Sequence, residues 1–268
     1  MLSRRDIRLP QVQYMLDNGC LPISVDFRLV PEINVRDGAM TDVCDALSWI
    51  QEQLPSLKLN RPGIRVGKKI IVVGWSTGGT LAMTIPASAM KRGIRPPDAV
   101  LALYCPTDFE SDFWRRSNFP EKSEQASKAD YDLLEGVFDR PVTEYKIPKE
   151  KLNVGGWMNL EDPRSRIVLH MNWQGQMPAI LLNGLPTKGS CKTSTDQYEL
   201  PRPSAGDIES ISPASQIRKG EYTVPTFLIH GKRRLDNTCQ IEYCVLTGFK
   251  CRHTGRLDSL AAVAANIY

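Results

Sequence analysis

The sequence has no run of about 18 apolar residues, the length that a membrane-spanning helix needs, so we expect no segment to cross a bilayer. Its first 19 residues carry charges without a continuous apolar core, and they therefore do not resemble a secretion signal. A C-x-x-C pair is also absent, and the seven cysteines are odd in number and irregular in spacing. Together these absences predict reduced thiols and a cytoplasmic protein.

The sequence also lacks a large excess of charge of one sign, and it lacks metal-binding motifs. The 34 basic residues are scattered among 30 acidic ones, for a net charge of +4, so no nucleic-acid partner is expected. The sequence contains no HExxH, no paired-histidine spacing and no phosphate-cradling GxGxxG. We therefore expect neither a metal ion nor an organic cofactor.

Helical and strand patterns alternate through the first 106 residues, which predicts the α/β class with a mostly parallel, doubly wound sheet. The strand at 70–73 is apolar throughout, as befits a central parallel strand buried on both faces. In chain order we expect a helix that ends at Gly19, a strand over 20–29, a helix over 37–54, a strand over 70–73, a helix over 77–90 and a strand over 98–106.

The alternation breaks after residue 106. Residues 107–218 are rich in Pro, Gly, Ser, Asp and aromatic residues and show weak periodicity, with possible short helices over 128–138 and 213–219. A strand pattern returns at 224–231. The length of 268 residues suits one domain, so we expect a single domain over 1–268 with residues 107–218 as an inserted lid.

A nucleophile motif lies where the strand at 70–73 meets the following helix. Gly74-Trp75-Ser76-Thr77-Gly78 matches G-x-S-x-G, the turn that exposes a serine hydroxyl in a strained backbone conformation between a strand and a helix. The glycines are expected to leave room for the neighbouring strand and helix. The backbone N–H of Thr77 is the expected oxyanion donor, supported by the positive end of the helix. Ser76 is therefore the predicted nucleophile.

An acid and a base should follow the serine in the order Ser, Asp or Glu, His. Of the three histidines, His170 lies in the presumed insertion, where a structural or substrate-facing role is expected. His230 belongs to the late strand and is expected to pack or bond locally at the strand end. We therefore predict Asp236 as the acid and His253 as the base, with a surface histidine in a basic loop as the alternative for His253.

Several segments resemble known hydrolases. Asp26-Phe27-Arg28-Leu29-Val30-Pro31-Glu32, followed by GWSTGG, resembles the hormone-sensitive-lipase-like branch of the α/β-hydrolases, which shows DYRLAPE at this place. The segments MLSRRDIR, VDFRLVPEINVRDGAMTDVCDAL, VVGWSTGGTLAMT, DPRSRIVLHMNWQGQ and PTFLIHG are similar, in this order, to the C-terminal thioesterase or esterase-like domains of fungal non-reducing polyketide synthases.

The resemblance implies a serine hydrolase without cofactors that acts on a small acyl ester or a carrier-bound acyl thioester. Such hydrolases carry a His-Gly-Gly loop, which forms half of the oxyanion hole, before the first helix. This sequence has no glycine before Gly19, so we expect the loop and the first strands of the sheet to be missing. The family's acid follows its HG pair closely, whereas here Lys232-Arg233-Arg234-Leu235 separates the pair from Asp236.

Two alternatives to an active enzyme follow from these departures. One is a catalytically impaired relative that binds a small hydrophobic ligand or a partner. The other is a chain that does not fold stably alone, because a sheet without its first strands exposes an edge. The oligomeric state, and the choice between hydrolysis, acyl transfer and cyclisation, stay open.

Overall fold

The computed structural model describes eight stretches of the chain, and beyond residue 231 it describes the backbone alone. The stretches are 9–57, 65–117, 136–139, 142–143, 163–185, 200–233, 239–247 and 250–256. The chain divides into two compact units. The first is built mainly from 24–39 and 109–211, and the second from 7–23, 40–108 and 212–268.

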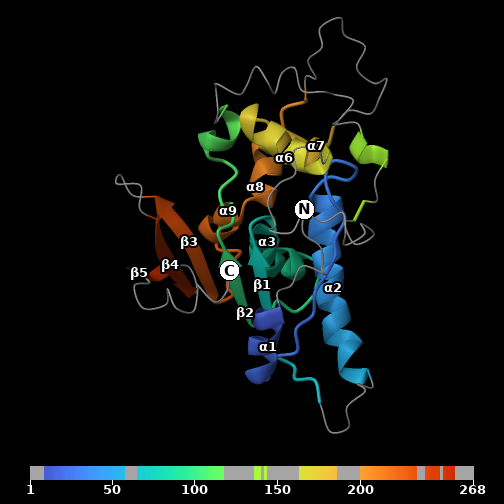
Figure 1. Ribbon diagram of the computed structural model, residues 1–268, viewed down its shortest axis with the longest axis vertical. Helices are drawn as coiled ribbons and strands as arrows, with labels where there is room; N and C mark the ends of the chain where they lie inside the picture. Colours follow the sequence, from blue (N-terminus) through green and yellow to red (C-terminus); the bar gives the residue numbers. More distant parts are fainter. Residues whose placement is uncertain are drawn as a thin grey trace, which may run out of the picture. The chain divides into compact units, whose positions relative to one another are not determined.

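A five-stranded sheet organises the second unit (Figure 1). Its strands lie in sequence order, and the first three are parallel, whereas the last two are antiparallel to their neighbours. The parallel strands β1 and β2 are separated by a helix, as a right-handed crossover requires. The strands are β1 (Ile71–Trp75), β2 (Ala99–Leu103), β3 (Thr226–Arg233), β4 (Cys239–Thr247) and β5 (Lys250–Arg256).

Helix α3 (Thr77–Lys91) is the packing centre of this unit. It contacts β1 and β2 directly, while α2 (Thr41–Glu52) and α9 (Pro213–Arg218) contact α3. Its sequence TGGTLAMTIPASAMK is rich in small residues, which allow the sheet to approach closely, and most of the helix is buried. The core includes Ala82, Met83, Val100, Ala102, Cys105, Tyr222 and Val224, with a second cluster of Leu47, Ile85 and Ala89.

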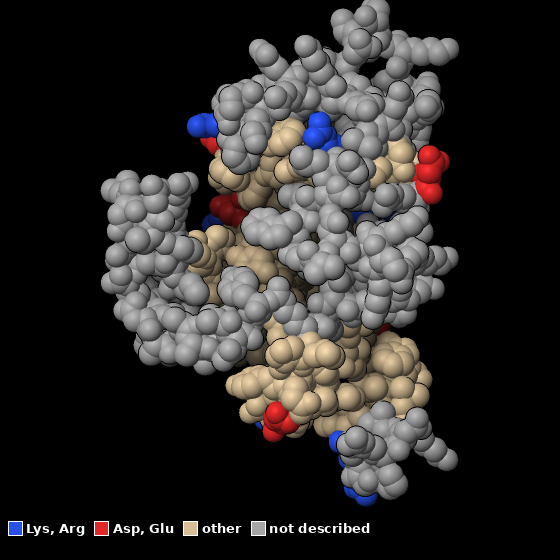
Figure 2. All heavy atoms as spheres, in the orientation of Figure 1, with Lys and Arg blue, Asp and Glu red and all other residues tan. Residues whose placement is uncertain are grey.

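Helix α1 (Leu9–Asp17) has no buried residue. The chain leaves it at Gly19, whose φ of 71° is the left-handed conformation that glycine adopts without strain, so the predicted helix stop is confirmed. Leu9 and Tyr14 are 81% and 66% exposed. In Figure 2 the surface over α1 is formed mainly by uncharged side chains.

One strand prediction needs correction. Residues 20–29 form no strand, because a strand needs a hydrogen-bonded neighbouring strand. The described backbone bonds here run from Cys20 N back to Met15 O of α1, at 2.8 Å, and from Leu29 N to Val142 O, at 3.0 Å. The alternative considered for His253, a surface histidine in a basic loop, does not match the backbone, because residues 250–256 form β5, which pairs with β4. The remaining helices and strands expected before residue 107, and the strand at 224–231, are confirmed within a few residues.

The regular elements described in the first unit are helices. Its helix α6 contacts α7 and the short helix η5, and α7 in turn contacts α8 and η4. Of these helices, η5 overlaps the short helix expected over 128–138, whereas sequence periodicity gave no sign of α6, α7, α8 or η4. Their bounds are α6 (Pro163–Trp173), α7 (Met177–Asn183), α8 (Ala205–Ile211), η4 (Asp112–Arg115) and η5 (Gly136–Asp139), and the short helices η2 (Arg36–Met40) and η3 (Leu54–Ser56) flank α2.

A buried ion pair ties residues 30–32 to α6 within the first unit. Arg164, whose side chain is 1% exposed, donates two hydrogen bonds to the Glu32 carboxylate, at 2.6 and 2.8 Å, and another to Val30 O at 2.9 Å. A paired guanidinium and carboxylate can be buried because each satisfies the charge of the other. This unit includes most of the insertion predicted over 107–218, whose role as a lid stays a prediction.

No helix in the described stretches combines the length and apolar character that crossing a membrane would require.

Candidate functional site

Ser76 lies at the junction between β1, which ends at Trp75, and α3, which begins at Thr77. Its backbone has φ 51° and ψ −126°, a conformation that costs a non-glycine residue about 1–3 kcal/mol. Three hydrogen bonds hold it: Ser76 N donates to Leu103 O at 3.0 Å, and Ser76 O accepts from the backbone N–H groups of Gly79 and Thr80. The residue is nevertheless exposed. This is the geometry of a strand-to-helix nucleophile turn.

Two glycines make this turn sterically possible. A Cβ added at Gly74 would lie 2.1 Å from Gly78 O, and one at Gly79 would lie 2.7 Å from Cys105 Cβ. At Gly78 an added Cβ meets nothing within 4 Å. The motif was expected to need glycine at 74 and 78, but the close contacts are at Gly74 and Gly79. Gly79 is the glycine of α3 that faces Cys105, just after β2.

The residues that follow the last pairs shared by the three parallel strands form a row next to Ser76. The register pairs Trp75 with Leu103 and Leu103 with Ile229, so the next residues along the three strands are Ser76, Tyr104 and His230. Neighbouring strands are about 5 Å apart. Sites in open α/β sheets lie at these carboxyl ends.

Two features of this row were not anticipated. Tyr104 has φ 39°, and together with Ser76 it makes up the non-glycine residues with positive φ among those described. His230 bonds locally as expected, by donating from Nδ1 to Gly231 O at 2.8 Å, but it does so within β3, which continues to Arg233, and not at the strand end. Its position in the row beside Tyr104 and Ser76 depends on strand register, which local sequence patterns do not specify.

Thr77 is the first residue of α3 and is exposed. The first N–H groups of a helix have no acceptor inside the helix, so they are available to an anion. The Thr77 N–H therefore meets the basic requirement for an oxyanion donor, and its role as one stays a prediction.

The predicted acid and base are not brought to Ser76 by any described contact. Asp236 lies outside the described residues. His253 lies in β5, where its backbone is opposite Val245 of β4, and its side chain is not described. Their assignment as acid and base stays a prediction. His170 is 5% exposed within α6, in the first unit.

The residues behind the turn are apolar and fixed. Burial raises the pKa of the Cys105 thiol to about 11, and its Sγ lies 3.9 Å from Met83 Sδ. Thr80 Oγ1 donates to Pro106 O at 2.7 Å, which anchors the chain just after Tyr104 to the first turn of α3. The thiol is therefore a packing group, while Ser76 is exposed at this edge, and its role as the nucleophile stays a prediction.

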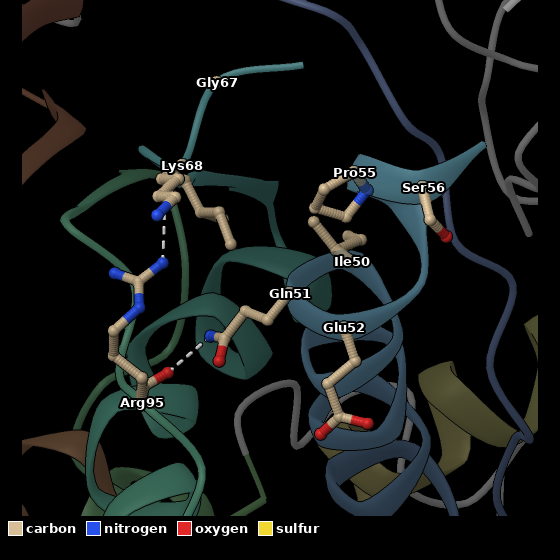
Figure 3. A pocket seen from close by; sticks show the side chains of 9 residues that line it. Ile50, Gln51, Glu52, Pro55, Ser56, Gly67, Lys68 and Arg95 are labelled. Carbon is tan, nitrogen blue, oxygen red and sulfur yellow. Dashed lines mark hydrogen bonds between the residues drawn. The ribbon is translucent and has the colours of Figure 1, made fainter. Parts of the chain in front are cut away.

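A hollow of about 430 Å³ lies elsewhere in the second unit (Figure 3). Gly67, Lys68 and Ile70, which line it, precede β1, whereas Ser76 follows β1. Figure 3 shows Gln51 bonded to the Arg95 carbonyl and Arg95 bonded to the Lys68 carbonyl across the hollow, at 2.7 and 2.9 Å. It thus lies at the amino end of the strand, away from the serine.

Metal-binding side chains do not gather in the described part of the chain, which contains no group of three or more His, Cys, Asp or Glu residues able to hold an ion.

Comparison with known proteins places this geometry in a family. The family model described as alpha/beta hydrolase fold matches residues 13–148, just over half of the chain. The chain belongs to the α/β-hydrolase fold family. The α/β fold class expected from the alternation of helices and strands is thereby confirmed. No solved structure matches the chain.

The relatives of this α/β-hydrolase chain are fungal polyketide synthases. It is 51% identical over 240 residues to a 5-methylorsellinic acid synthase of Aspergillus terreus, covering 87% of the chain and 9% of that protein. It is 49% identical over 244 residues to the non-reducing polyketide synthase adrD of Penicillium roqueforti, covering 90% and 10%. It is 42% identical over 269 residues to the non-reducing polyketide synthase ausA of Penicillium brasilianum, covering 98% and 11%.

The chain therefore spans about a tenth of the length of these relatives. The resemblance to part of the fungal non-reducing polyketide synthases, drawn from sequence segments, is confirmed.

Proposed function

We propose that the chain is a serine hydrolase that cleaves an ester or thioester through an acyl-enzyme, in the cytoplasm. The observation that carries the proposal is Ser76, an exposed serine held at φ 51° between β1 and α3. A non-glycine residue persists in such a conformation where the surrounding structure over-determines it, and such residues cluster at active sites.

The proposed reaction has two halves. In the first, Ser76 Oγ bonds to the acyl carbon, its proton passes to the base, and the thiol or alcohol leaves after taking up that proton. In the second, water adds to the acyl carbon and the bond to Ser76 Oγ breaks, which releases the acid. The Thr77 N–H stabilises the oxyanion in both halves, where one such donor is worth about 10²–10³ in rate.

The chain order Ser, Asp, His makes His253 the candidate base and Asp236 the candidate acid that orients it in this proposal, although the sheet holds the backbone of His253 in β5, four strands from β1. The substrate is a small-molecule acyl ester or a carrier-bound acyl thioester, with an aromatic polyketide acyl group as the class suggested by the polyketide synthase relatives. Residues 107–218 act as a lid that shapes the acyl site.

A fluorophosphonate probe tests the nucleophile, since it phosphonylates an activated serine covalently. We expect labelling of the folded wild-type chain and its loss in Ser76→Ala, measured by intact mass. His253→Gln should slow labelling at least a hundredfold, because a serine hydroxyl without its base is a poor nucleophile.

The controls separate the possible outcomes. Ser88→Ala, in the same helix but far along it from the turn, should label at the wild-type rate. A wild-type chain that unfolds cooperatively on heating yet takes no label would contradict the proposal and favour a non-catalytic protein that binds a small hydrophobic ligand or a partner.

A further inference from the structure

Tyr104 is the residue next to Ser76 in the row at the carboxyl ends of the strands. It directly follows β2, and its predecessor Leu103 accepts the hydrogen bond from Ser76 N at 3.0 Å. With neighbouring strands about 5 Å apart, the residue in this position borders any group bound to Ser76 Oγ.

The backbone of Tyr104 is as unusual as that of Ser76. Its φ of 39° lies in the range that favours glycine, and a bulky residue there is an outlier. Such strain gathers at functional sites, and here the second strained residue lies beside the first. A tyrosine in place of a glycine indicates that its side chain is used.

The surrounding contacts fix where this side chain begins. Tyr104 N donates to Ile229 O at 2.6 Å, on the side away from Ser76. Cys105, which follows, is buried against Gly79, and Pro106 O accepts from Thr80 Oγ1. Contacts to the strands on either side and to α3 therefore fix the backbone of Tyr104, while 42% of the residue's surface is exposed.

We propose that Tyr104 determines acyl specificity: its ring contacts the acyl group that Ser76 attacks and favours flat aromatic acyl groups over compact aliphatic ones. This inference rests on the proposed function of Ser76. The physical basis is ring stacking, in which offset or edge-to-face aromatic pairs gain affinity beyond the area that they bury. Aliphatic groups as small as acetyl cannot reach across the ring and gain little from it.

Two model esters test the proposal in the intact chain. For 4-nitrophenyl benzoate and 4-nitrophenyl acetate, the benzoate-to-acetate ratio of kcat/KM should fall about tenfold in Tyr104→Ala. In Tyr104→Phe, which keeps the ring, it should stay within twofold of the wild-type ratio. If Tyr104→Ala leaves the ratio unchanged, whether kcat/KM falls equally for both esters or for neither, the proposal is overturned.

A binding measurement separates this inference from the proposed function. In a Ser76→Ala background, saturation-transfer NMR of methyl benzoate should show severalfold weaker signals when Tyr104→Ala is added. If the wild-type chain is labelled by the fluorophosphonate but Tyr104→Ala does not weaken the methyl benzoate signal, only the role of Tyr104 is overturned. The difference without labelling overturns the proposed nucleophile alone, and the absence of both overturns both.

Tyr104→Gly distinguishes a specificity role from a structural one. Glycine suits φ 39°, so the melting temperature should stay the same or rise while the aromatic preference is lost. A lower melting temperature with an unchanged benzoate-to-acetate ratio would assign the tyrosine to stability and contradict the proposal.

Discussion

At the scale of single residues, Ser76 and Tyr104 adopt positive φ angles, which residues other than glycine avoid. The backbone N–H of each donates a hydrogen bond to the neighbouring strand. Ser76 N bonds to β2 and Tyr104 N bonds to β3. Hydrogen bonds to the parallel sheet therefore hold both residues in these strained conformations. They make the turn rigid and keep the serine hydroxyl out of the core.

The glycines around Ser76 give a prediction at this scale. Gly74→Ala should abolish stable folding or destabilise the chain by about 3 kcal/mol or more, because its Cβ would lie 2.1 Å from the backbone oxygen of Gly78. Gly79→Ala should destabilise it by about 1–3 kcal/mol through overpacking against Cys105. Urea unfolding curves of the variants measure both effects.

Gly78→Ala is the matched control, since its added methyl group meets nothing within 4 Å and alanine favours a helix by up to about 1 kcal/mol. We expect stability equal to or above that of the wild type. A Gly78→Ala variant as unstable as Gly74→Ala would mean that the steric explanation is wrong.

Sequence reasoning succeeded at this scale where the chemistry is local. The pentapeptide around Ser76 specifies a turn through neighbouring residues, so its position could be predicted. The need for glycine at 79 in place of 78, and the place of Tyr104, depend on how β2 approaches α3. That approach is a contact between residues about 25 positions apart, which no local pattern encodes.

At the scale of elements, Asp98 joins the beginnings of β1 and β2. Its carboxylate accepts from Ile70 N at 2.8 Å and from Arg95, while its own N–H donates to Ile70 O. The hydrogen bond from the Ile70 backbone, with help from Arg95, lowers the pKa of Asp98 below its ordinary value. The ionised form is thus preferred in the folded protein.

A lowered pKa gives stability that is present above the ordinary pKa of an aspartate, about 4, and lost as the pH falls through the folded value. We therefore expect Asp98→Asn to lower the melting temperature at pH 6–7, roughly the range in which the carboxylate is fully ionised. The difference from the wild type should shrink as the pH falls below about 4. Thermal unfolding across this pH range measures it.

Arg95→Gln serves as the comparison. It removes the ion pair but keeps the bond from Ile70, the larger cause of the lowered pKa, so most of the pH dependence should remain. A pH dependence lost in Arg95→Gln and kept in Asp98→Asn would contradict this assignment.

Strands and helices were predictable to different degrees. The parallel strands β1, β2 and β3 are short apolar runs, and they form as expected. Residues 20–29 also contain β-branched residues, but no strand among the described residues pairs with them, so propensity alone did not make a strand. Helix α6 escaped prediction because Arg164, Ser165 and His170 are buried in it, so no polar face alternates with an apolar one.

At the scale of the whole molecule, two of the described cysteines lie inside the second unit, and a third lies on its surface. Cys44 and Cys105 are buried, whereas Cys20 is exposed. Burial raises the pKa of the Cys44 thiol, against the opposing effect of Arg92, and raises that of Cys105 from 9.0 to about 11. Both thiols are therefore hidden and protonated near neutral pH.

This contrast predicts the pattern of alkylation. With iodoacetamide at about pH 8, near the ordinary pKa of a thiol, Cys20 should react first. Cys44 and Cys105 should react only as the second unit opens, so their rates should rise together with added urea. Mass spectrometry of peptides resolves each site.

Complete unfolding in concentrated urea gives the reference, in which the three thiols should react at similar rates. A Cys105 that is alkylated as fast as Cys20 in the folded protein would show that the packing of Cys105 against Gly79 and Met83 is wrong.

The division into two units was the part of the molecular plan least accessible from sequence. Residues 24–39 lie in one unit with 109–211 through Val35 N to Leu181 O and the Glu32–Arg164 pair. These contacts join segments more than 100 residues apart. A break in periodicity after residue 106 marks where an insertion begins, but it carries no information about the earlier segment that joins it.

The strain at Ser76 also bears on how this family changes over evolutionary time. Glycine alone adopts φ 51° and ψ −126° without cost, so selection for stability favours glycine at this position, and selection for the proposed reaction opposes it. In a lineage that no longer needs the reaction, this serine should be replaced early, before the buried residues of α3 drift. The residue at this one position is thus a sensitive sign, in any related sequence, of whether its chemistry is still maintained.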